Sequence, residues 1–472
     1  MKVLLTGATG YIAKRLLPIL LKQGHEVVCC VRDERRFTPS YLCSGKCSVI
    51  EVDFLVKEEL HVIPDDIEIA YYLIHSMTGT VKDFDVLEAE AANNFRDRIN
   101  QTQTKQVIYL GGIVNEKVLS KHLESRHQVE KILSTGRYHL TSLRAGIIVG
   151  SGSASFEIIR DLVEKLPVMV APKWLNTRTQ PISVRNVVQF LSGVINHEKT
   201  FDKSFDIGGP EILTYKKMLL TFARIRRLKR AIITIPVLSP KLSSYWLYFV
   251  TSTSYKLAAN LVDSMKVEVI CQPNDLHKIL DIHLISYENA VKLAFDTIAQ
   301  HHVLSSWTDA MSSEVLKKGL SHRIEVPVFG CLKDKRKITV KDEERTLKKI
   351  WSLGGETGWL YANWLWELRG ALDKLVGGVG IRRGRRDPMD LVVGDSLDFW
   401  RVIDASKEQK RLLLYAEMKV PGEAWLEFRI ENNILYQTAT LRPRGLWGRI
   451  YWFSVFPFHG IVFNGLIKKL AQ

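Results

Sequence analysis

The sequence predicts an α/β protein with a doubly wound parallel sheet, followed by a smaller α+β domain. Three observations lead to this prediction. A glycine-containing turn joins an apolar segment to a helical one at the start of the chain. Short apolar segments then alternate with helical ones over the first 150 residues, and the hydrophobic period changes to two in residues 411–441. Strands of a parallel sheet covered on both faces read as continuous apolar runs.

Length and composition set the scale of the protein. With 472 residues, of which 46% are hydrophobic, the chain is long enough for two or three domains. Its net charge of +15 comes from scattered clusters, which favour solvated surfaces over a nucleic-acid site; an acidic cofactor, an acidic substrate or an anionic membrane fits equally well. The six cysteines lack paired metal-ligand spacing and no signal peptide precedes Gly7, so we expect a cytoplasmic protein without a metal site.

The first turn of the chain predicts a dinucleotide site. Residues 3–5 form a short apolar strand, and residues 11–23 have helical spacing. Between them, Gly7 and Gly10 let the backbone turn tightly and approach a phosphate, because neither carries a Cβ. A strand, a glycine turn and a helix N-terminus together can bind a pyrophosphate. We therefore expect the cofactor to contact Thr6, Gly7, Thr9, Gly10, Tyr11 and Ile12.

The remaining elements of the first domain follow in order. Strands are predicted at residues 26–31, 48–52, 68–73, 106–110 and 139–143, and helices at residues 83–99 and 120–134. The first of these helices carries a single apolar stripe, which we expect to pack on the sheet. The carboxyl ends of parallel strands share one edge of the sheet, where the glycine turn also lies, so the cofactor should bind there.

The residues after the second strand bear on the choice between NADP(H) and NAD(H). An arginine at this place binds a 2′-phosphate, whereas an acid binds a free 2′-hydroxyl. Arg32, helped by Arg35 or Arg36, favours NADP(H). Asp33 leaves NAD(H) open, and a charged exposed loop is the simpler alternative. Asp53, after the third strand, is placed to reach the adenine edge.

These motifs resemble the short-chain dehydrogenase/reductase superfamily, most closely its extended and atypical members, which include epimerase-like and quinone-reductase-like proteins. The resemblance covers about residues 1–300 and rests on residues 6–12, Arg32, Val52-Asp53, residues 143–150 and residues 205–210. It implies an NAD(P)-binding Rossmann domain with a substrate region from about residue 150. It also implies that Gly111 and Gly146 lie in the cofactor site.

The catalytic residues of that superfamily are not found at the matching positions. Its members carry a serine after the fifth strand and a Tyr-x-x-x-Lys pair on the next helix, whereas this chain has Gly111-Gly112 at the serine position. His122 falls at the place of the tyrosine and Arg126 at that of the lysine, so the two share a helix face one turn apart.

Two interpretations of this pair remain open. In the first, His122 is the general acid or base and Arg126 holds the ribose or a substrate oxygen. In the second, both side chains only form hydrogen bonds in a site that has lost its proton-transfer chemistry. Asn94, on the inner face of the preceding helix, is a further candidate, for binding a water molecule in the site.

A second domain is predicted at residues 342–472, after a linker at residues 301–341. Its alternating strands are joined by a hairpin turn at Asn432-Asn433 and followed by a long final helix. This part resembles the helix-grip fold of lipid-transfer and polyketide-cyclase proteins, and more narrowly an uncharacterised domain that often follows atypical short-chain reductases in bacteria. The narrower resemblance rests on residues 364–370, 382–386, 398–401 and 441–446. Helix-grip folds commonly enclose an apolar cavity, which implies an apolar or aromatic ligand.

The final helix raises the question of a membrane. Residues 450–467 contain no Asp, Glu, Lys or Arg over 18 positions, which reaches the lower bound for a membrane span. Pro457, His459 and Asn464 favour instead the buried last helix of a soluble domain. Peripheral contact with the inner face of a membrane remains open, through Trp452, Phe453, Phe456 and Phe458.

The sequence therefore predicts a cytoplasmic, two-domain oxidoreductase that uses NADP(H), or alternatively NAD(H), to transfer hydride to an apolar carbonyl, enone or quinone compound. The alternative is a non-enzymatic NADP(H)-binding redox sensor or assembly factor with a tail that binds an apolar ligand.

Overall fold

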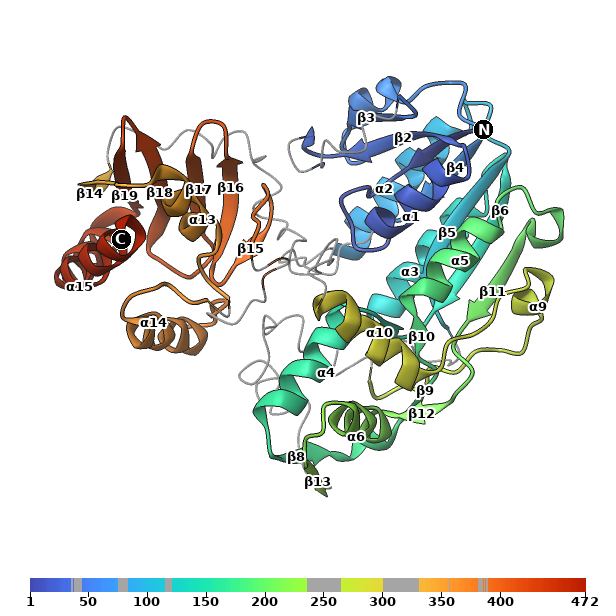
Figure 1. Cartoon of the computed structure of the whole chain (residues 1–472). Coiled ribbons are helices and arrows are strands. Elements are labelled where there is room, and N and C mark those ends of the chain that lie inside the picture. The colour runs from blue at the N-terminus through green and yellow to red at the C-terminus, as the bar shows by residue number, and fades with distance from the viewer. Residues whose placement is uncertain are drawn as a thin grey trace. The chain divides into compact units, whose positions relative to one another are not determined.

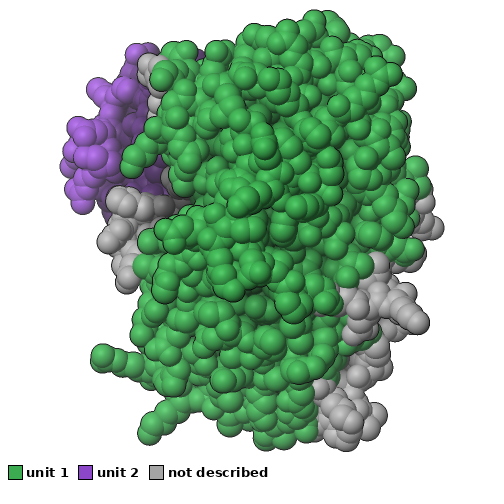
Figure 2. Space-filling view, turned by 90° about the vertical axis from the view of Figure 1, so that its right-hand side faces the viewer, with its two compact units in different colours: residues 1–250, 255–307 green, residues 251–254, 308–472 purple. Residues whose placement is uncertain are grey.

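The chain forms two compact units in the computed structural model. Unit 1 comprises Met1–Val250 and Tyr255–Trp307, and unit 2 comprises Thr251–Ser254 and Thr308–Gln472 (Figures 1 and 2). The residues that the structure describes are 1–34, 37, 45–74, 84–114, 121–235, 265–299, 331–355, 357–380, 385, 387 and 389–472.

Unit 1 is built on a seven-stranded sheet in which all strands are parallel. The strand order is β11-β6-β5-β4-β1-β2-β3. The strands are β1 (Lys2–Leu5), β2 (Glu26–Val31), β3 (Cys47–Glu51), β4 (Ile69–Tyr72), β5 (Gln106–Gly112), β6 (His139–Ala145) and β11 (Lys203–Ile207). The six predicted strands are present with ends within two residues of their predicted positions, and β11 is an addition. The predicted doubly wound parallel sheet is thus confirmed.

Successive residues of β1 face opposite cores. The helices that cover the sheet are α1 (Ala13–Lys22), α2 (Phe84–Ile99), α3 (Lys121–Leu133) and α5 (Val184–Gly193). Val3 and Leu5 belong to a core that includes residues of α1 and α5, whereas Leu4 belongs to one that includes residues of α2 and α3. The sheet is therefore covered on both faces, as Figure 1 shows.

The later part of unit 1 adds a third apolar core. Its elements are β7 (Ile148–Val149), α4 (Ala154–Lys165), β8 (Val168–Pro172), β9 (Arg178–Thr179), β10 (Ile182–Ser183), β12 (Leu213–Thr214), α6 (Tyr215–Ile225), β13 (Ala231–Ile235), α9 (Leu276–Ile279) and α10 (Tyr287–Ala299). Phe156, Phe222 and Tyr287 are buried together at the centre of this core. The serine-rich turn before α4 ends in Ser153, whose side chain caps the helix by accepting a hydrogen bond from the Phe156 amide.

Unit 2 is a separate, sheet-rich domain. Its six-stranded antiparallel sheet has the order β14-β19-β18-β17-β16-β15. The strands are β14 (Leu332–Thr339), β15 (Ser396–Leu397), β16 (Trp400–Ser406), β17 (Arg411–Ala416), β18 (Gly422–Glu431) and β19 (Ile434–Pro443); the helices are α13 (Glu343–Trp351), α14 (Asn363–Leu375) and α15 (Gly445–Ala471). Asn432 and Asn433 both have positive φ, which confirms the predicted hairpin turn.

The first strand of unit 2 lies within the predicted linker. β14 pairs along its whole length with β19, from Leu332 opposite Leu441 to Thr339 opposite Ile434. The predicted boundary at residue 342 is therefore too late. The error has a physical cause: β14 reads as a charge-dense run because Lys333, Lys335 and Lys337 alternate along it, and charged residues at alternate positions suit one face of an edge strand.

The final helix is buried along only part of its surface. α15 contacts β14 and β19, and its buried apolar side chains include Phe463, Leu466 and Leu470. Near its N-terminus, however, Trp447 is 76% exposed and Phe453 is 65% exposed. The expectation of a buried last helix therefore holds for one face of α15 only.

A buried carboxyl group links the turn between β15 and β16 to residues 355–359. Asp398 has a φ of +52° and is 5% exposed. One of its oxygens accepts a hydrogen bond from the Trp359 indole at 2.8 Å, and the other accepts a longer one from the Gly355 amide at 3.4 Å. Burial raises the pKa of Asp398 to about 7, although both hydrogen bonds oppose the rise.

The pKa of Asp398 makes the stability of unit 2 depend on pH. Because the folded pKa lies above the ordinary value, the folded state binds more protons than the unfolded state between about pH 4 and 7, and this group's contribution to stability is lost as pH rises through that window. The variant Asp398→Asn removes the ionisable carboxyl group, and asparagine adopts a positive φ as readily as aspartate does. The free energy of unfolding of the variant minus that of the parent should rise with pH, by at most about 1.4 kcal/mol per pH unit, and level off above about pH 7.

The measurement is denaturant unfolding followed by tryptophan fluorescence, because eight of the 11 tryptophans lie after residue 350. A difference between variant and parent that does not change with pH would show that the pKa of Asp398 is not raised in the folded protein.

Candidate cofactor and active site

The glycine turn is locked onto the neighbouring strand. The Thr6 hydroxyl donates to the Tyr71 carbonyl oxygen at 2.9 Å and accepts from the Leu73 amide at 3.0 Å, which joins the ends of β1 and β4. Gly7 follows with a φ of +63°, and a Cβ there would lie 2.9 Å from the Leu73 carbonyl oxygen. The turn therefore lies where the strand order reverses, at the carboxyl edge of the sheet.

No side chain of α1 itself compensates the positive end of its helix dipole at the N-terminus. The Gly10 amide donates to the Gly7 carbonyl oxygen at 2.7 Å, which closes the turn. Ile12 occupies the N-cap position and makes no side-chain cap, and no acidic residue lies in the first turn of α1. This end of the helix suits a pyrophosphate, as predicted from the glycine spacing. The helix begins at Ala13, two residues later than expected, because residues 10–12 belong to the turn.

Tyr11 and Arg15 tie the turn to the loop after β7. The Arg15 guanidinium lies 3.9 Å from the centre of the Tyr11 ring and donates to the Tyr11 and Ser151 carbonyl oxygens at 2.9 and 2.8 Å. Burial raises the pKa of Tyr11 to about 12, so the phenol is neutral at physiological pH. Tyr11 therefore holds the turn by packing. Thr9, beside it in the turn, is half-buried.

The residues directly after β2 and β3 lie at the carboxyl edge of the sheet. Arg32 is exposed directly after β2, and its guanidinium interacts electrostatically with the Asp53 carboxylate. Asp53 is held in place, since one of its oxygens accepts from the Leu55 amide at 3.0 Å and its own amide donates to Glu59 at 2.8 Å. Asp33 is buried. Arg35, the second predicted arginine, lies outside the described residues.

At the end of β5, glycine lets the next helix come close. A Cβ on Gly112 would lie 2.9 Å from Leu123 and 3.3 Å from the Arg126 side chain. The Arg126 side chain thus packs over the strand end that carries Gly111 and Gly112, and its carbonyl oxygen accepts a hydrogen bond from the Tyr109 hydroxyl at 3.1 Å. Arg126 is therefore at the carboxyl edge of the sheet, as the resemblance implied.

The other two catalytic candidates differ in what the structure shows. His122 lies in the first turn of α3, one turn before Arg126, and its side chain is outside the described part of the chain. Asn94 is buried, and its amide donates to the Phe54 carbonyl oxygen at 2.8 Å. This bond accounts for Asn94 as a residue that holds the chain after β3, and the catalytic role suggested for it gains no support.

A buried ion pair that the sequence analysis did not single out fixes α3 to the sheet. Glu130 accepts two hydrogen bonds from Arg144 of β6, at 2.9 and 2.8 Å, and one from the Ser204 hydroxyl at 2.5 Å. Burial opposes ionisation of Glu130, but these hydrogen bonds prevail and lower its pKa. The signal was in the sequence: Glu130 follows Arg126 by one helical turn, on the side of α3 that faces the sheet.

The segment after residue 265 returns across the ends of β6 and β11 and forms an apolar wall beside Gly146. A Cβ on Gly146 would lie 3.0 Å from the Val269 side chain and 3.6 Å from Ile113. Farther along, the Asn274 amide donates to the Asp206 carbonyl oxygen at 2.8 Å. The described side chains nearest Gly146 are therefore apolar. No local pattern in the chain predicts this wall, because the contact joins segments more than 120 residues apart.

Comparisons with known proteins agree with this geometry. Residues 7–160 match a family described as NAD(P)H-binding, and residues 331–466 match one described as a protein of unknown function, DUF2867. No curated protein matches the chain. The N-terminal region is therefore an NAD(P)H-binding domain, and the C-terminal region is a separate domain fused to it.

Solved structures show the same fold for unit 1. A nucleoside-diphosphate-sugar epimerase from Staphylococcus aureus is 15% identical, with a TM-score of 0.50 over 62% of this chain and 100% of that one. Triphenylmethane reductase from Citrobacter sp. is 17% identical, with a TM-score of 0.51 over 63% of this chain and 100% of that one. The same enzyme complexed with NADP(H) is 17% identical, with a TM-score of 0.50 over 62% of this chain and 99% of that one. The predicted likeness to reductases and epimerases with a Rossmann fold is thus confirmed.

The glycine turn can be tested by adding a single methyl group. A Cβ on Gly10 would lie 2.9 Å from the Gly7 carbonyl oxygen, so Gly10→Ala must shift the turn that faces the pyrophosphate. We expect isothermal titration calorimetry to show at least about tenfold weaker binding of both NADPH and NADH, which corresponds to about 1.4 kcal/mol.

Gly24→Ala is the matched control, because Gly24 follows the other end of α1 and a Cβ there meets nothing within 4 Å. Its φ of +87° means that this substitution strains the backbone without touching the site. Equal affinities for Gly10→Ala and Gly24→Ala would place the cofactor elsewhere.

Proposed function

With an NAD(P)H-binding domain as the premise, we propose that the protein is an NADPH-dependent reductase of an apolar carbonyl, enone or quinone compound. The observation that carries the proposal is the position of Arg126, which packs over the end of β5 at the carboxyl edge of the sheet, where the glycine turn also lies. A cation at this edge can hold the ribose or polarise the oxygen of a substrate.

In this proposal, different residues of unit 1 bind the pyrophosphate, the adenine and the 2′-phosphate of the cofactor. The turn at Gly7 and Gly10 and the N-terminus of α1 would hold the pyrophosphate, and Asp53 would face the adenine. Arg32, which is exposed as a residue, would form a charge-assisted bond to a 2′-phosphate, which favours NADPH over NADH. NADPH supplies the hydride; the chain itself must supply a proton and a place for the substrate.

Proton transfer falls to α3 in this proposal. Gly111 and Gly112 replace the serine of related enzymes, and the tyrosine and lysine positions hold His122 and Arg126. Histidine can donate a proton near neutral pH, whereas the guanidinium of arginine stays charged. We therefore assign proton donation to His122 and oxygen binding to Arg126. The Glu130–Arg144 ion pair keeps α3 in position for both.

The apolar substrate class is supported by the surroundings of Gly146. Val269 and Ile113 are the side chains that approach it, and Ile113 is buried. A hydrophobic wall favours a substrate with an apolar body. Triphenylmethane reductase, which shares the fold, serves in the bioremediation of triphenylmethane dyes. Such dyes therefore belong in the set of trial substrates.

The second candidate function is a redox sensor that binds NADP(H) without turnover. The observation that favours it is the loss of the serine, tyrosine and lysine of related enzymes. In that case the nucleotide would act as a signal or as part of the structure, and unit 2 would transmit its presence.

The choice of cofactor can be tested at Arg32. A charge-assisted hydrogen bond contributes about 1.5–3 kcal/mol, so Arg32→Ala should weaken NADPH binding by roughly ten- to a hundredfold and leave NADH binding nearly unchanged. Arg32→Lys, which keeps the charge but not the planar fork, should lose less. Competition calorimetry with both cofactors measures the effect, and equal losses for the two cofactors would exclude a 2′-phosphate contact.

Catalysis can be tested on the α3 pair. NADPH oxidation should be measured with quinones, enones, aldehydes and triphenylmethane dyes. His122→Gln should abolish turnover and leave NADPH affinity unchanged, while Arg126→Ala should lower kcat/KM at least about a hundredfold. His127→Gln, on another side of the same helix, is the control and should stay active. Full activity of His122→Gln would exclude its role; a parent inactive on every compound would favour the sensor.

A further inference from the structure

Unit 2 exposes a broad apolar face on its final helix. On α15, Trp447, Ile450, Phe453, Phe458 and Ile461 are between 45% and 76% exposed. With 3.6 residues per turn they lie on the side opposite the buried ones, such as Trp452, Phe463 and Leu466. Exposed aromatic residues clustered in this way on one helix mark a surface that binds something.

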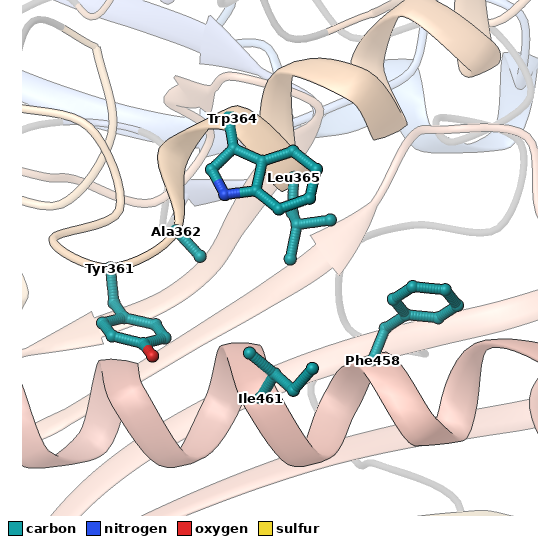
Figure 3. Close-up of a pocket in the computed structure, with 6 residues that line it drawn as sticks. All are labelled: Tyr361, Ala362, Trp364, Leu365, Phe458 and Ile461. Carbon is teal, nitrogen blue, oxygen red and sulfur yellow. The ribbon is translucent and has the colours of Figure 1, made fainter.

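The start of α14 extends this face. Trp364, which is 65% exposed, and Tyr361 lie beside Phe458 and Ile461 around a groove of about 350 Å³ (Figure 3). The segment just before α14 comes close to α15 because Gly465 has no side chain: a Cβ there would lie 2.0 Å from the Tyr361 ring. We call Trp364, Trp447, Ile450, Phe453, Phe458 and Ile461 the docking face.

The charge along α15 and the strand before it is of one sign. From residue 432 to residue 472 the sequence has five Arg or Lys residues and no Asp or Glu. Arg444 and Arg449 lie at the N-terminal end of α15 and Lys468 and Lys469 at its C-terminal end, and all four are exposed. An apolar, aromatic strip with cations at both ends is complementary to an anionic lipid surface, whose headgroups would meet the cations while the acyl region receives the aromatic rings.

We propose that the docking face binds an anionic lipid bilayer, with α15 lying in the plane of the interface. Among the described residues, one helix segment, Leu446–Ala471, is long and apolar enough to cross a membrane, with a mean hydropathy of 1.4. It cannot cross while unit 2 stays folded, because its other face is buried against β14 and β19. Lying in the plane lets the exposed face enter the bilayer and leaves the packing of unit 2 intact.

The same charges argue against a second copy of the chain as the occupant. A symmetric dimer through this face would bring two sets of cationic ends together without an acid in residues 432–472 to pair with them. A bilayer with anionic headgroups neutralises these cations. The proposal is independent of the catalytic one, since it rests on unit 2 alone.

The test is flotation of the full-length protein with vesicles of two compositions, phosphatidylcholine alone and phosphatidylcholine with about 30 mol% phosphatidylglycerol. We expect binding to the anionic vesicles, weakened by salt, and at least about tenfold weaker binding to the neutral ones. The double variant Trp447→Glu/Phe453→Glu should lose at least about tenfold in affinity for the anionic vesicles, because two aromatic side chains no longer insert.

Matched variants separate the apolar and ionic contributions. Arg444→Glu/Arg449→Glu should weaken binding to the anionic vesicles and reduce its dependence on salt. Ile212→Glu alters an apolar side chain of unit 1 that is 49% exposed and should bind as the parent does. Circular dichroism melts should show all three variants folded, since every altered side chain is exposed.

Four outcomes would overturn the proposal. The first is that the parent does not bind anionic vesicles. The second is that the Trp447→Glu/Phe453→Glu variant binds them as tightly as the parent does. The third is that the parent does not bind vesicles and that sedimentation velocity shows a parent dimer which this variant abolishes; a second copy of the chain would then be the occupant. The fourth is that neither high salt nor alkaline carbonate releases the parent from vesicles, which would mean that α15 crosses the bilayer.

Discussion

The backbone of Gly7 lies so close to the Leu73 carbonyl oxygen that any side chain would have to displace the end of β4. The rest of unit 1 depends on this contact. With the Thr6 hydroxyl, which bonds to both Tyr71 and Leu73, it holds the end of β1 against that of β4. The start of α1 is thereby aimed into the crevice where the strand order reverses, and the positive end of the helix faces the place a pyrophosphate would take.

A second glycine, Gly112 at the end of β5, also allows a close contact, here with the side chain of Arg126. At the position where the resemblance implies a serine, the chain has Gly111-Gly112, and the Arg126 side chain lies beside Gly112. The proposed site would thus have a permanent cation in place of a neutral hydrogen-bond donor. Because a guanidinium does not give up its proton, the proposed reductase would need a different side chain of α3 for proton transfer.

How far the sequence predicted the structure depended on whether the signal was local. The six strands, the α2 and α3 helices and the Asn432-Asn433 turn were predictable because periodicity and turn chemistry are encoded within a few residues. Contacts between distant segments were not predictable, and the wall formed by Val269 beside Gly146 is one of them. β14 was missed because alternating lysines resemble a solvated linker until the partner strand is known. The division of α15 into a buried and an exposed apolar face was not predicted, because apolar residues surround the helix and their spacing does not show which face is buried.

The pairing of the first strand of unit 2 with the last also shapes how this domain must form. β14 and β19 are neighbours in the sheet, yet the whole of α13, α14 and β15 to β18 lies between them in the chain. A nascent chain therefore exposes β14 as an unpaired strand until β19 has left the ribosome, and closing so long a loop slows folding. The lysines at alternate positions of β14 keep that strand soluble and discourage it from pairing with another molecule during the wait.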